Sequence, residues 1–579
     1  MSNTNKANAL KTSNYPVERP NLEMMGSSSF APNSRKKKVN SDGRDYAIHR
    51  AYESLVWFFI GVLRMNTFFE TFARNIELHA ILRKSKPRSR LSYLIPFLAL
   101  ILLVNLPSLS AAGQEEAEEA EEAEEADETE EAEETEGDEE AEEAGETDET
   151  EVVDPFTLPA DEQPRALRDP NLGIEVLVTG LYRPSQMEFL GSSSNDIIVT
   201  DKDNGTVRRI INGVVQPEPL IDVAVANNND TNERGLLGME VAKQNETTTY
   251  VFLYYTESGD GRDGSDSEGV VPAGNRLYRY ELVQNTDGTA QLINPKLLLD
   301  LPARPGPRYN GGPLLVSQNQ TDTIIYLQIG DLDHRTSQAN NFADGPPADG
   351  TGGILAVDVE GNPLPNPVLL AQASADEDNG EEDIGMLPYY FAYGIRNGYG
   401  MAIDPVTGYL WDTENGPEWF DEINLVLPGF NSGWQPIQGP ASAPENQAAN
   451  IEEDLVDFGG VGVYRDPEFA WQTPVGVTAI NFINSTALGA EYQNDLLVAD
   501  INYGRIYHFD LNQDRTGLML EGALEDKVAD NAAELDSILF GTGFRAITDI
   551  EIGPDGYLYL VGYGPNGRVV KIAPTAEQG

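Results

Sequence analysis

The stretch Gly556-Tyr-Leu-Tyr-Leu560, followed after a polar turn by Gly567-Arg-Val-Val-Lys-Ile572, shows the unit from which most of this chain is built. An apolar strand ends near Asp or Gly, a polar loop follows, and a second alternating strand usually opens with Gly. From Gly173 onwards the unit appears six times, and the other five copies begin at Ile197, Val251, Ile325, Gly408 and Asp495. Short alternating runs, without an apolar stretch of helical period and length, predict an all-β repeat protein.

Such a unit cannot bury both of its faces alone. Radial packing into a propeller hides the faces and leaves only short edges. The sequence therefore predicts a six-bladed β-propeller over residues 152–579. Three long inserts, 258–273, 332–350 and 435–472, are expected as loops on its faces, which is where binding residues are commonly carried.

Charge divides the 579-residue chain into three parts. Residues 1–112 hold 16 Lys/Arg and 7 Asp/Glu, residues 113–151 hold 24 acids and no base, and residues 152–579 hold 23 bases and 64 acids. The net charge of −56 excludes a general nucleic-acid binder, because phosphates would be repelled. The absence of cysteine excludes disulfides, thiol catalysis and Cys-ligated metal sites. The absence of a Gly-x-Ser-x-Gly elbow argues against an esterase or protease.

The N-terminal part is predicted to direct export. Residues 1–92 read as a disordered basic region or as an over-extended start of the reading frame. Residues 93–112 join a short apolar run to the small residues Ser110 and Ala112, the pattern of a secretory signal. The apolar run is short for a bilayer span of ~20 residues, so we expect cleavage after Ala112, with an uncleaved membrane anchor as the alternative. Residues 113–151 cannot collapse and are predicted to be a disordered acidic stalk.

Four segments of the body, in this order, resemble the glucose/sorbosone dehydrogenase family: Glu233-Arg-Gly-Leu-Leu-Gly238, Tyr309-Asn-Gly-Gly312, Tyr393-Gly-Ile-Arg-Asn397 and Thr413-Glu-Asn-Gly-Pro417. The resemblance covers roughly residues 173–573. It implies a soluble six-bladed propeller that oxidises the C1 hydroxyl of aldoses by hydride transfer to pyrroloquinoline quinone (PQQ), with calcium as a second cofactor. It also implies an external electron acceptor.

The resemblance assigns roles to particular residues. Arg396, with Asn397 beside it, would pair with a quinone carboxylate through its guanidinium; a buried arginine that ties blade loops together is the alternative. The backbone carbonyls of Gly416 and Pro417 would bind the calcium of the cofactor, and Glu422 is an acid nearby. A tight turn that binds no metal is the alternative here.

Three positions depart from the family pattern. The family's base histidine directly before Asn-Gly-Gly is Tyr309 here, and a phenol is a poor base at neutral pH unless a cation such as Arg308 activates it. A family lysine is missing from residues 500–504, and a family arginine pair is missing from residues 546–549. A cofactor with three carboxylates would be held more weakly by the remaining Arg396.

His334 is the other candidate base, because it follows a strand and lies in a loop that could reach the mouth of the propeller. A loop histidine paired with Asp331 or Asp333 is the alternative. Four aromatic residues of the inserts could either stack on a sugar or plug the loops from within: Trp419, Phe420, Trp434 and Trp471.

Two functions follow from these residues. One is an exported PQQ-dependent aldose sugar dehydrogenase that acts on small-molecule sugars. The other is a catalytically weakened or inactive calcium-stabilised propeller that binds carbohydrate or a protein partner, because a fold does not determine a function. Under either, the body is expected outside the cell or at its surface, and it would touch a membrane only through an uncleaved 93–112 segment.

Overall fold

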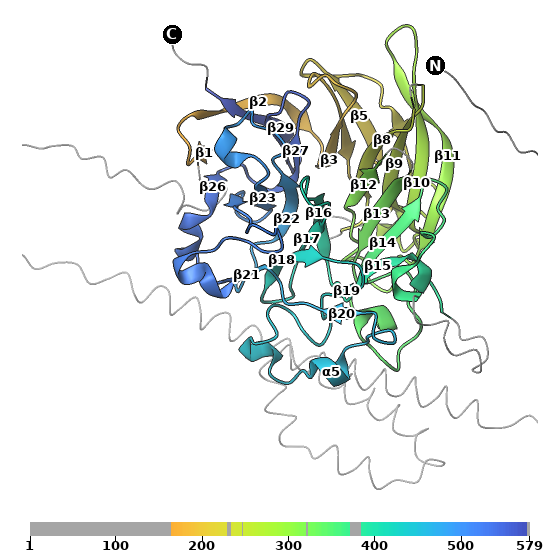
Figure 1. Cartoon of the computed structure of the whole chain (residues 1–579). Helices are drawn as coiled ribbons and strands as arrows, with labels where there is room; N and C mark the ends of the chain where they lie inside the picture. Colours follow the sequence, from red (N-terminus) through yellow and green to blue (C-terminus); the bar gives the residue numbers. More distant parts are fainter. Residues whose placement is uncertain (1–163, 228–232, 246, 320–321, 371–383, 576–579) are drawn as a thin grey trace, which may run out of the picture. The chain divides into compact units, whose positions relative to one another are not determined.

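The computed structural model describes residues 164–227, 233–245, 247–319, 322–370 and 384–575 (Figure 1). The predicted basic region, signal or anchor segment and acidic stalk (1–92, 93–112 and 113–151) lie outside the described residues, and their boundaries stay predictions. Strands dominate the described residues, and the α-helix α5 spans only Ile451–Asp454. Within the described ranges, no helix is long and apolar enough to cross a membrane.

The described residues form six sheets, and each sheet runs outward from an innermost strand. The innermost strands are β3 (Pro184–Phe189), β8 (Leu236–Lys243), β12 (Leu314–Gln318), β16 (Gly398–Ile403), β22 (Val477–Phe482) and β27 (Ile547–Ile552). Each of them contacts the next, and β27 contacts β3, so that the ring closes (Figure 1). The predicted class, an all-β propeller, is confirmed.

The second and third strands of each sheet are the segments that the sequence repeat predicts. They are β4 (Asp196–Asp201) with β5 (Thr206–Ile211), β9 (Thr249–Glu257) with β10 (Gly274–Gln284), β13 (Thr323–Ile329) with β14 (Gly353–Asp358), β17 (Leu410–Glu414) with β18 (Asp421–Val426), β23 (Leu496–Asp500) with β24 (Ile506–Phe509), and β28 (Leu558–Gly562) with β29 (Gly567–Pro574). Their apolar side chains, such as Ile198 and Leu327, are fully buried in the hydrophobic clusters between sheets. Each such burial stabilises the fold by roughly 1.5–3 kcal/mol.

The remaining strands complete the outer parts of the sheets. They are β6 (Val214–Val215), β7 (Ile221–Asp222), β11 (Ala290–Leu301), β15 (Tyr390–Tyr393), β19 (Phe430–Asn431), β20 (Val463–Tyr464), β21 (Phe469–Trp471), β25 (Val528–Ala529) and β26 (Leu539–Thr542). The insert 435–472 is therefore only partly a loop, because β20 and β21 fall within it. Both strands are too short to show an alternating pattern, so the sequence did not reveal them.

The first long strand of the body closes the ring. Strand β2 (Leu172–Leu181) pairs antiparallel with β29, with Leu172 opposite Pro574 and Leu181 opposite Gly567. Just before it, β1 (Ala166–Leu167) pairs with β26 of the neighbouring sheet. Two sheets are thus completed by residues from the start of the described body.

Hydroxyl groups join neighbouring innermost strands where those strands begin. Thr478 Oγ1 donates to the carbonyl of Ile547 at 2.7 Å, and Ser185 Oγ donates to the carbonyl of Leu236 at 3.0 Å. These bonds hold the strand starts at defined distances from one another. They therefore also position the residues that directly precede the strands.

Candidate active site

Residues that precede three neighbouring innermost strands meet at one end of the ring, which we call the mouth. Glu233 precedes β8, Tyr309 precedes β12 and Arg396 precedes β16. The backbone N–H of Tyr309 donates to Glu233 Oε2 at 2.6 Å, and Arg396 Nη2 donates to Tyr309 Oη at 2.5 Å. Three of the segments that resemble the family are thus in direct contact.

A close approach of two loops places Tyr309 next to Arg396. A Cβ atom on Gly330 would lie 2.3 Å from the carbonyl oxygen of Arg396 and 2.6 Å from that of Tyr309, so only glycine fits between them. Tyr309 itself has a φ of +59°, in the left-handed region that non-glycine residues seldom adopt. Such conformations cluster at functional sites, where the surrounding structure holds them in place.

The Arg396 side chain is buried at the centre of the mouth. Its guanidinium carbon lies 4.1 Å from the ring centroid of Tyr309 and 5.4 Å from that of Trp434. Arg396 Nη1 donates to the carbonyl oxygens of Asn415 and Gly416 at 2.8 and 2.9 Å. The guanidinium therefore ties loops of two sheets together and already contacts one of the carbonyls expected to bind calcium.

His334 lies at the same mouth, as predicted. Its ring centroid is 6.5 Å from those of both Tyr309 and Trp434, and its side chain is 62% exposed. His334 Nδ1 is 3.9 Å from Oδ2 of the buried Asp331, which also accepts a hydrogen bond from Trp434 Nε1 at 2.8 Å. Burial raises the pKa of Asp331, and the hydrogen bond from Trp434 opposes the rise. Of the two aspartates considered from sequence, Asp331 is the one with an ion-pair contact to His334.

Two buried glutamates lie behind the mouth on facing strands, where β17 and β18 pair Glu414 with Glu422. Glu414 accepts a hydrogen bond from Ser432 Oγ at 2.6 Å, whereas Glu422 accepts from Gln438 Nε2 at 2.8 Å and from the N–H of Gly439 at 2.5 Å. Burial raises the pKa of Glu414 to about 7, and burial together with repulsion from Glu414 raises the pKa of Glu422 well above its ordinary value. Protein donors occupy the Glu422 carboxylate, so its metal role stays a prediction.

The turn that would bind calcium is held by Asp421. One oxygen of this carboxylate accepts from the N–H of Gly416 at 3.0 Å, and the other accepts from the three N–H groups of residues 475–477 at 2.7 to 3.1 Å. A single side chain thereby fixes the turn after β17 to the start of β22. The Gly416 carbonyl is oriented toward Arg396, while Pro417 is exposed.

Two buried polar atoms at the mouth have no hydrogen-bond partner within the described residues. They are Nε of Arg396 and Oδ1 of Asn397, in residues that are 4% and 6% exposed. A buried polar atom left unpaired costs about 1–3 kcal/mol, so such atoms suit a ligand that supplies the missing partner. They belong to the two residues that the resemblance assigns to the quinone, and they fit a hydrogen-bonding, anionic cofactor.

Glu233 is a mouth residue to which the sequence assigned no role. Burial raises the pKa of Glu233, and the N–H of Tyr309 and the positive charges of Arg396, Arg308 and Lys202 oppose the rise. The sequence did offer an indication of this residue, because Glu233 is the first residue of the first family-like segment. Its contact with Tyr309 arises only when the sheets assemble. Arg308, considered as the activator of the phenol, acts on Glu233 instead, while Arg396 contacts the phenol oxygen.

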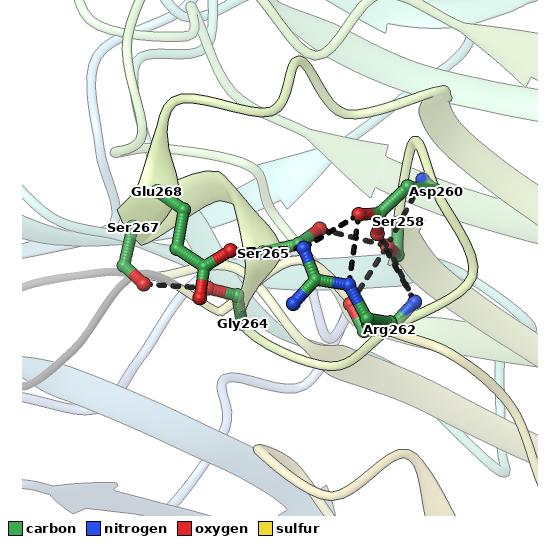
Figure 2. A network of polar contacts seen from close by, with 7 residues as sticks. All are labelled: Ser258, Asp260, Arg262, Gly264, Ser265, Ser267 and Glu268. Atoms are coloured by element: carbon green, nitrogen blue, oxygen red, sulfur yellow. Dashed lines mark hydrogen bonds and ion pairs between the residues drawn. The ribbon is translucent and has the colours of Figure 1, made fainter.

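The insert after β9 contains a network of polar contacts of its own (Figure 2). Within it, Arg262 Nη2 donates to Asp260 at 2.8 Å and closes the loop on itself. Asp266 of the same loop accepts from Arg234 Nη1 at 3.0 Å, and Arg234 Nη2 donates to two carbonyls of the loop 303–306 that leads to Tyr309. The insert thus positions Glu233 through its neighbour in sequence.

Two of the four aromatic residues considered from sequence are plugs. Phe420 and Trp471 are 2% and 1% exposed, and Trp471 belongs to strand β21. Trp434 is also buried, but it lies against Arg396 and His334 at the mouth. Sugar stacking on Phe420 or Trp471 is therefore wrong, because neither ring is accessible to a ligand.

The described residues form an all-β propeller, and the residues that meet at its mouth precede its innermost strands. The glucose/sorbosone dehydrogenase family model matches residues 181–571, and the chain belongs to this family. The sequence resemblance is thereby confirmed.

Named relatives lie in the same family. The chain is 28% identical over 207 residues to aldose sugar dehydrogenase YliI of Escherichia coli strain K12, a match that covers 36% of this chain and 50% of that protein. It is 24% identical over 311 residues to quinoprotein glucose dehydrogenase B of Acinetobacter calcoaceticus, covering 51% of this chain and 59% of that protein. The chain thus spans little more than half the length of these two relatives. A crystal structure of a glucose dehydrogenase matches with a TM-score of 0.51 at 20% identity, over 70% of this chain and 100% of that one, and this likeness shows the fold alone.

Proposed function

We propose that this protein is an exported aldose sugar dehydrogenase that uses PQQ and calcium to oxidise the C1 hydroxyl of sugars. The observation that carries the proposal is the pair of unpaired buried atoms on Arg396 and Asn397, in the mouth of a chain that belongs to the glucose/sorbosone dehydrogenase family. The printed names of two relatives, an aldose sugar dehydrogenase and a quinoprotein glucose dehydrogenase, support the same reaction.

The chain's own residues would divide the work. Arg396 and Asn397 would hold the quinone, and the carbonyls of Gly416 and Pro417 would hold calcium, which accepts neutral oxygen ligands. When bound, the quinone would supply the electrophile that takes the hydride from C1. The protein must then remove the proton of the sugar hydroxyl, a task for a base within hydrogen-bond reach.

Three mouth residues are candidates for that base. Tyr309 stands at the family's base position, with Arg396 as donor to its oxygen. His334 is exposed beside it. Glu233 is the third candidate, because it is a carboxylate in direct contact with the Tyr309 backbone, and burial raises its pKa.

One observation favours the second function, a propeller that binds carbohydrate or a protein partner without turnover. The guanidinium of Arg396 already donates to the carbonyl of Gly416 and to the hydroxyl of Tyr309. In this arrangement a protein cation stands beside the carbonyl that calcium would use. Cofactor binding would then require Arg396 to change its hydrogen bonds.

A dye-coupled assay with aldoses, PQQ and calcium would test the proposal on the full chain between pH 6 and 10, with quinone binding followed in parallel by absorbance. We expect quinone binding and turnover, with Glu233→Gln reducing turnover by roughly 10²–10⁴-fold while binding is kept. Tyr309→Phe and Tyr309→His separate the phenol's contribution. Activity that depends on Tyr309 and rises toward alkaline pH would assign the base to the phenol instead. If neither the wild type nor Tyr309→His binds quinone, the non-catalytic propeller is the remaining function.

Export and partners belong to the same proposal. The signal-like pattern before Gly113 would place the body outside the cell or at its surface, where it would meet sugars and an external electron acceptor. Mass spectrometry of the protein from the culture medium and the membrane fraction should find a mature N-terminus near Gly113. An intact Met1 on membrane-bound protein would instead support the uncleaved anchor.

A further inference from the structure

A second cluster of ligand-type side chains lies away from the mouth. Strand β23 pairs Asp500, at its mouth end, with Val477 at the start of β22. Asp495 precedes the opposite end of β23, and His508 and Asp510 lie on or just beyond β24 at that same end. The three residues therefore gather at the far end of one sheet.

The cluster has the geometry of a metal site. One ligand atom from each of Asp495, His508 and Asp510 lies within 4.8 Å of the other two. His508 Nε2 is 2.9 Å from Asp495 Oδ2. A small adjustment of side chains would bring all three atoms to a common ion, because ligands about 2.0–2.2 Å from a metal are a few ångströms apart.

The carboxylates of Asp495 and Asp510 face each other, and a positive charge between them would reduce their repulsion. Leu496 pairs with Phe509, so the next residues outward, Asp495 and Asp510, face each other across the strands. Like charges directly opposite one another destabilise a sheet. Within the described residues, the ion pair of this cluster joins Asp495 to His508.

Neighbouring groups hold the imidazole in place. The Tyr492 ring packs edge-on against the His508 ring, with 5.4 Å between their centroids. The centroid of the Phe540 ring lies 6.3 Å from that of His508. The Tyr492 hydroxyl donates to Asp169 at 3.0 Å. The cluster is thus rigid on its histidine side, and it adjoins the segment that leads into β2.

We propose that Asp495, His508 and Asp510 bind a divalent transition-metal ion of the zinc class. One imidazole nitrogen with two carboxylate oxygens suits zinc and similar ions, whereas calcium takes six to eight oxygens. Three protein ligands leave at least one coordination position for water. The bound ion neutralises the facing carboxylates and joins β23 to β24 beneath Tyr492. The site is separate from the mouth and independent of the proposed reaction.

The test uses the full chain after chelator treatment and dialysis. Isothermal titration with Zn²⁺ and thermal unfolding with and without the ion measure affinity and stabilisation, and Co²⁺ absorbance in the visible range reports coordination by nitrogen. The variants are His508→Gln and Asp510→Asn. Asp514→Asn removes the same charge from an exposed position in the turn after β24 and is the matched control.

We expect a zinc-dependent rise in Tm in the wild type and in Asp514→Asn, because an ion bound only by the native state stabilises that state. Loss of a ligand in His508→Gln or Asp510→Asn should weaken this binding at least about tenfold and remove the Co²⁺ band. Circular dichroism verifies that the variants are folded. Equal zinc affinity in His508→Gln and wild type, or no effect of zinc on the Tm of the wild type, would overturn the proposal and leave a simple histidine–carboxylate hydrogen bond.

Discussion

The mouth is formed by loops and strand ends, whereas the central channel is lined by the innermost strands, and buried acids have different surroundings in the two regions. At the mouth, Glu233, Asp331 and Glu414 all lie within the field of Arg396, which opposes the rise in their pKa values. Neutral donors such as Ser432 add to this effect. The charge of Arg396 therefore limits how far burial raises the pKa values of these three acids.

The channel below it, a cavity of about 430 Å³, holds four acids without a comparable cation among its lining residues. They are Glu188, Glu240, Asp549 and Glu551. Burial raises the pKa of Asp549 to about 7, and burial with repulsion from acidic neighbours raises the pKa values of the three glutamates well above their ordinary value. The acids of the mouth thus lie near cations, whereas those of the channel have no cation among the lining residues and must be neutralised by protons.

The largest expected effect on stability comes from removing the charge of Arg396 at the mouth. Replacing Arg396 by Met keeps its size but removes the one cation that acts on all three of Asp331, Glu233 and Glu414, and it removes three side-chain hydrogen bonds. Removing one partner of a buried charge pair typically costs about 3–5 kcal/mol. Denaturant unfolding should show a loss of this size in the free energy of unfolding. Arg396→Lys, which keeps the charge but not the planar fork, should lose less, and a wild-type value for Arg396→Met would contradict the role assigned to the charge.

In the channel, by contrast, removing the ionisable group of a buried acid should increase the stability of the protein. Because the pKa of Glu240 is raised in the folded state, the native state holds a proton that the unfolded chain releases above its ordinary pKa. The resulting stability is present below the unfolded pKa and is lost as the pH rises through the folded pKa. Glu240→Gln should therefore stabilise the protein by about 1–3 kcal/mol at pH 8 and have little effect at pH 4.

Thermal unfolding of Glu240→Gln across that pH range measures the difference. Glu218→Gln, at an exposed position, is the control and should leave the pH dependence unchanged. A Glu240→Gln variant that is destabilised at pH 8 would show that the channel acids are charged and compensated.

A smaller effect is expected at the support of the mouth. Trp434→Phe removes the Nε1–H donor of the buried Asp331, and its smaller ring loses contact with Arg396. Leaving a buried acceptor less satisfied costs about 1–3 kcal/mol. The midpoint of denaturant unfolding should fall accordingly, whereas Trp419→Phe, at a partly exposed position, should change it little.

The smallest effect on stability is expected at His334, because its side chain is 62% exposed. His334→Gln should change the free energy of unfolding by no more than about 0.5 kcal/mol. A larger change would mean that its contact with Asp331 is part of the mouth's charge balance. If the change in the free energy of unfolding is as small as expected, any loss of turnover in His334→Gln reflects chemistry and not unfolding.

How far the sequence could predict the structure depends on what each strand faces. The middle strands pack on both sides, so their apolar runs are visible, and the expected segment Asp421–Val426 coincides with β18. The innermost strands carry acids such as Glu188 and Glu240 toward the channel, which interrupts their apolar pattern and hides them. The sequence did not identify them as strands of the repeat.

The same distinction applies to the site. Tyr309, His334 and Arg396 could be assigned to one mouth because each belongs to a family-like segment or follows a strand. The contact between Glu233 and Tyr309 joins two sheets and depends on the closure of the whole ring. The far cluster was missed for a similar reason, because His508 alone resembles an ordinary strand residue, and its contact with Asp495 forms only when β23 and β24 pair.

The pairing of β2 with β29 has a consequence for the order of synthesis. Nearly 400 residues separate the two strands, which at 5–20 residues per second corresponds to roughly 20–80 seconds on the ribosome. During this time β2 has an open edge, a surface that can pair with other chains. A premature stop codon that deletes only β29 would also leave β2 without its partner. A truncation at the C-terminus would therefore disrupt the sheet that begins near the start of the described body.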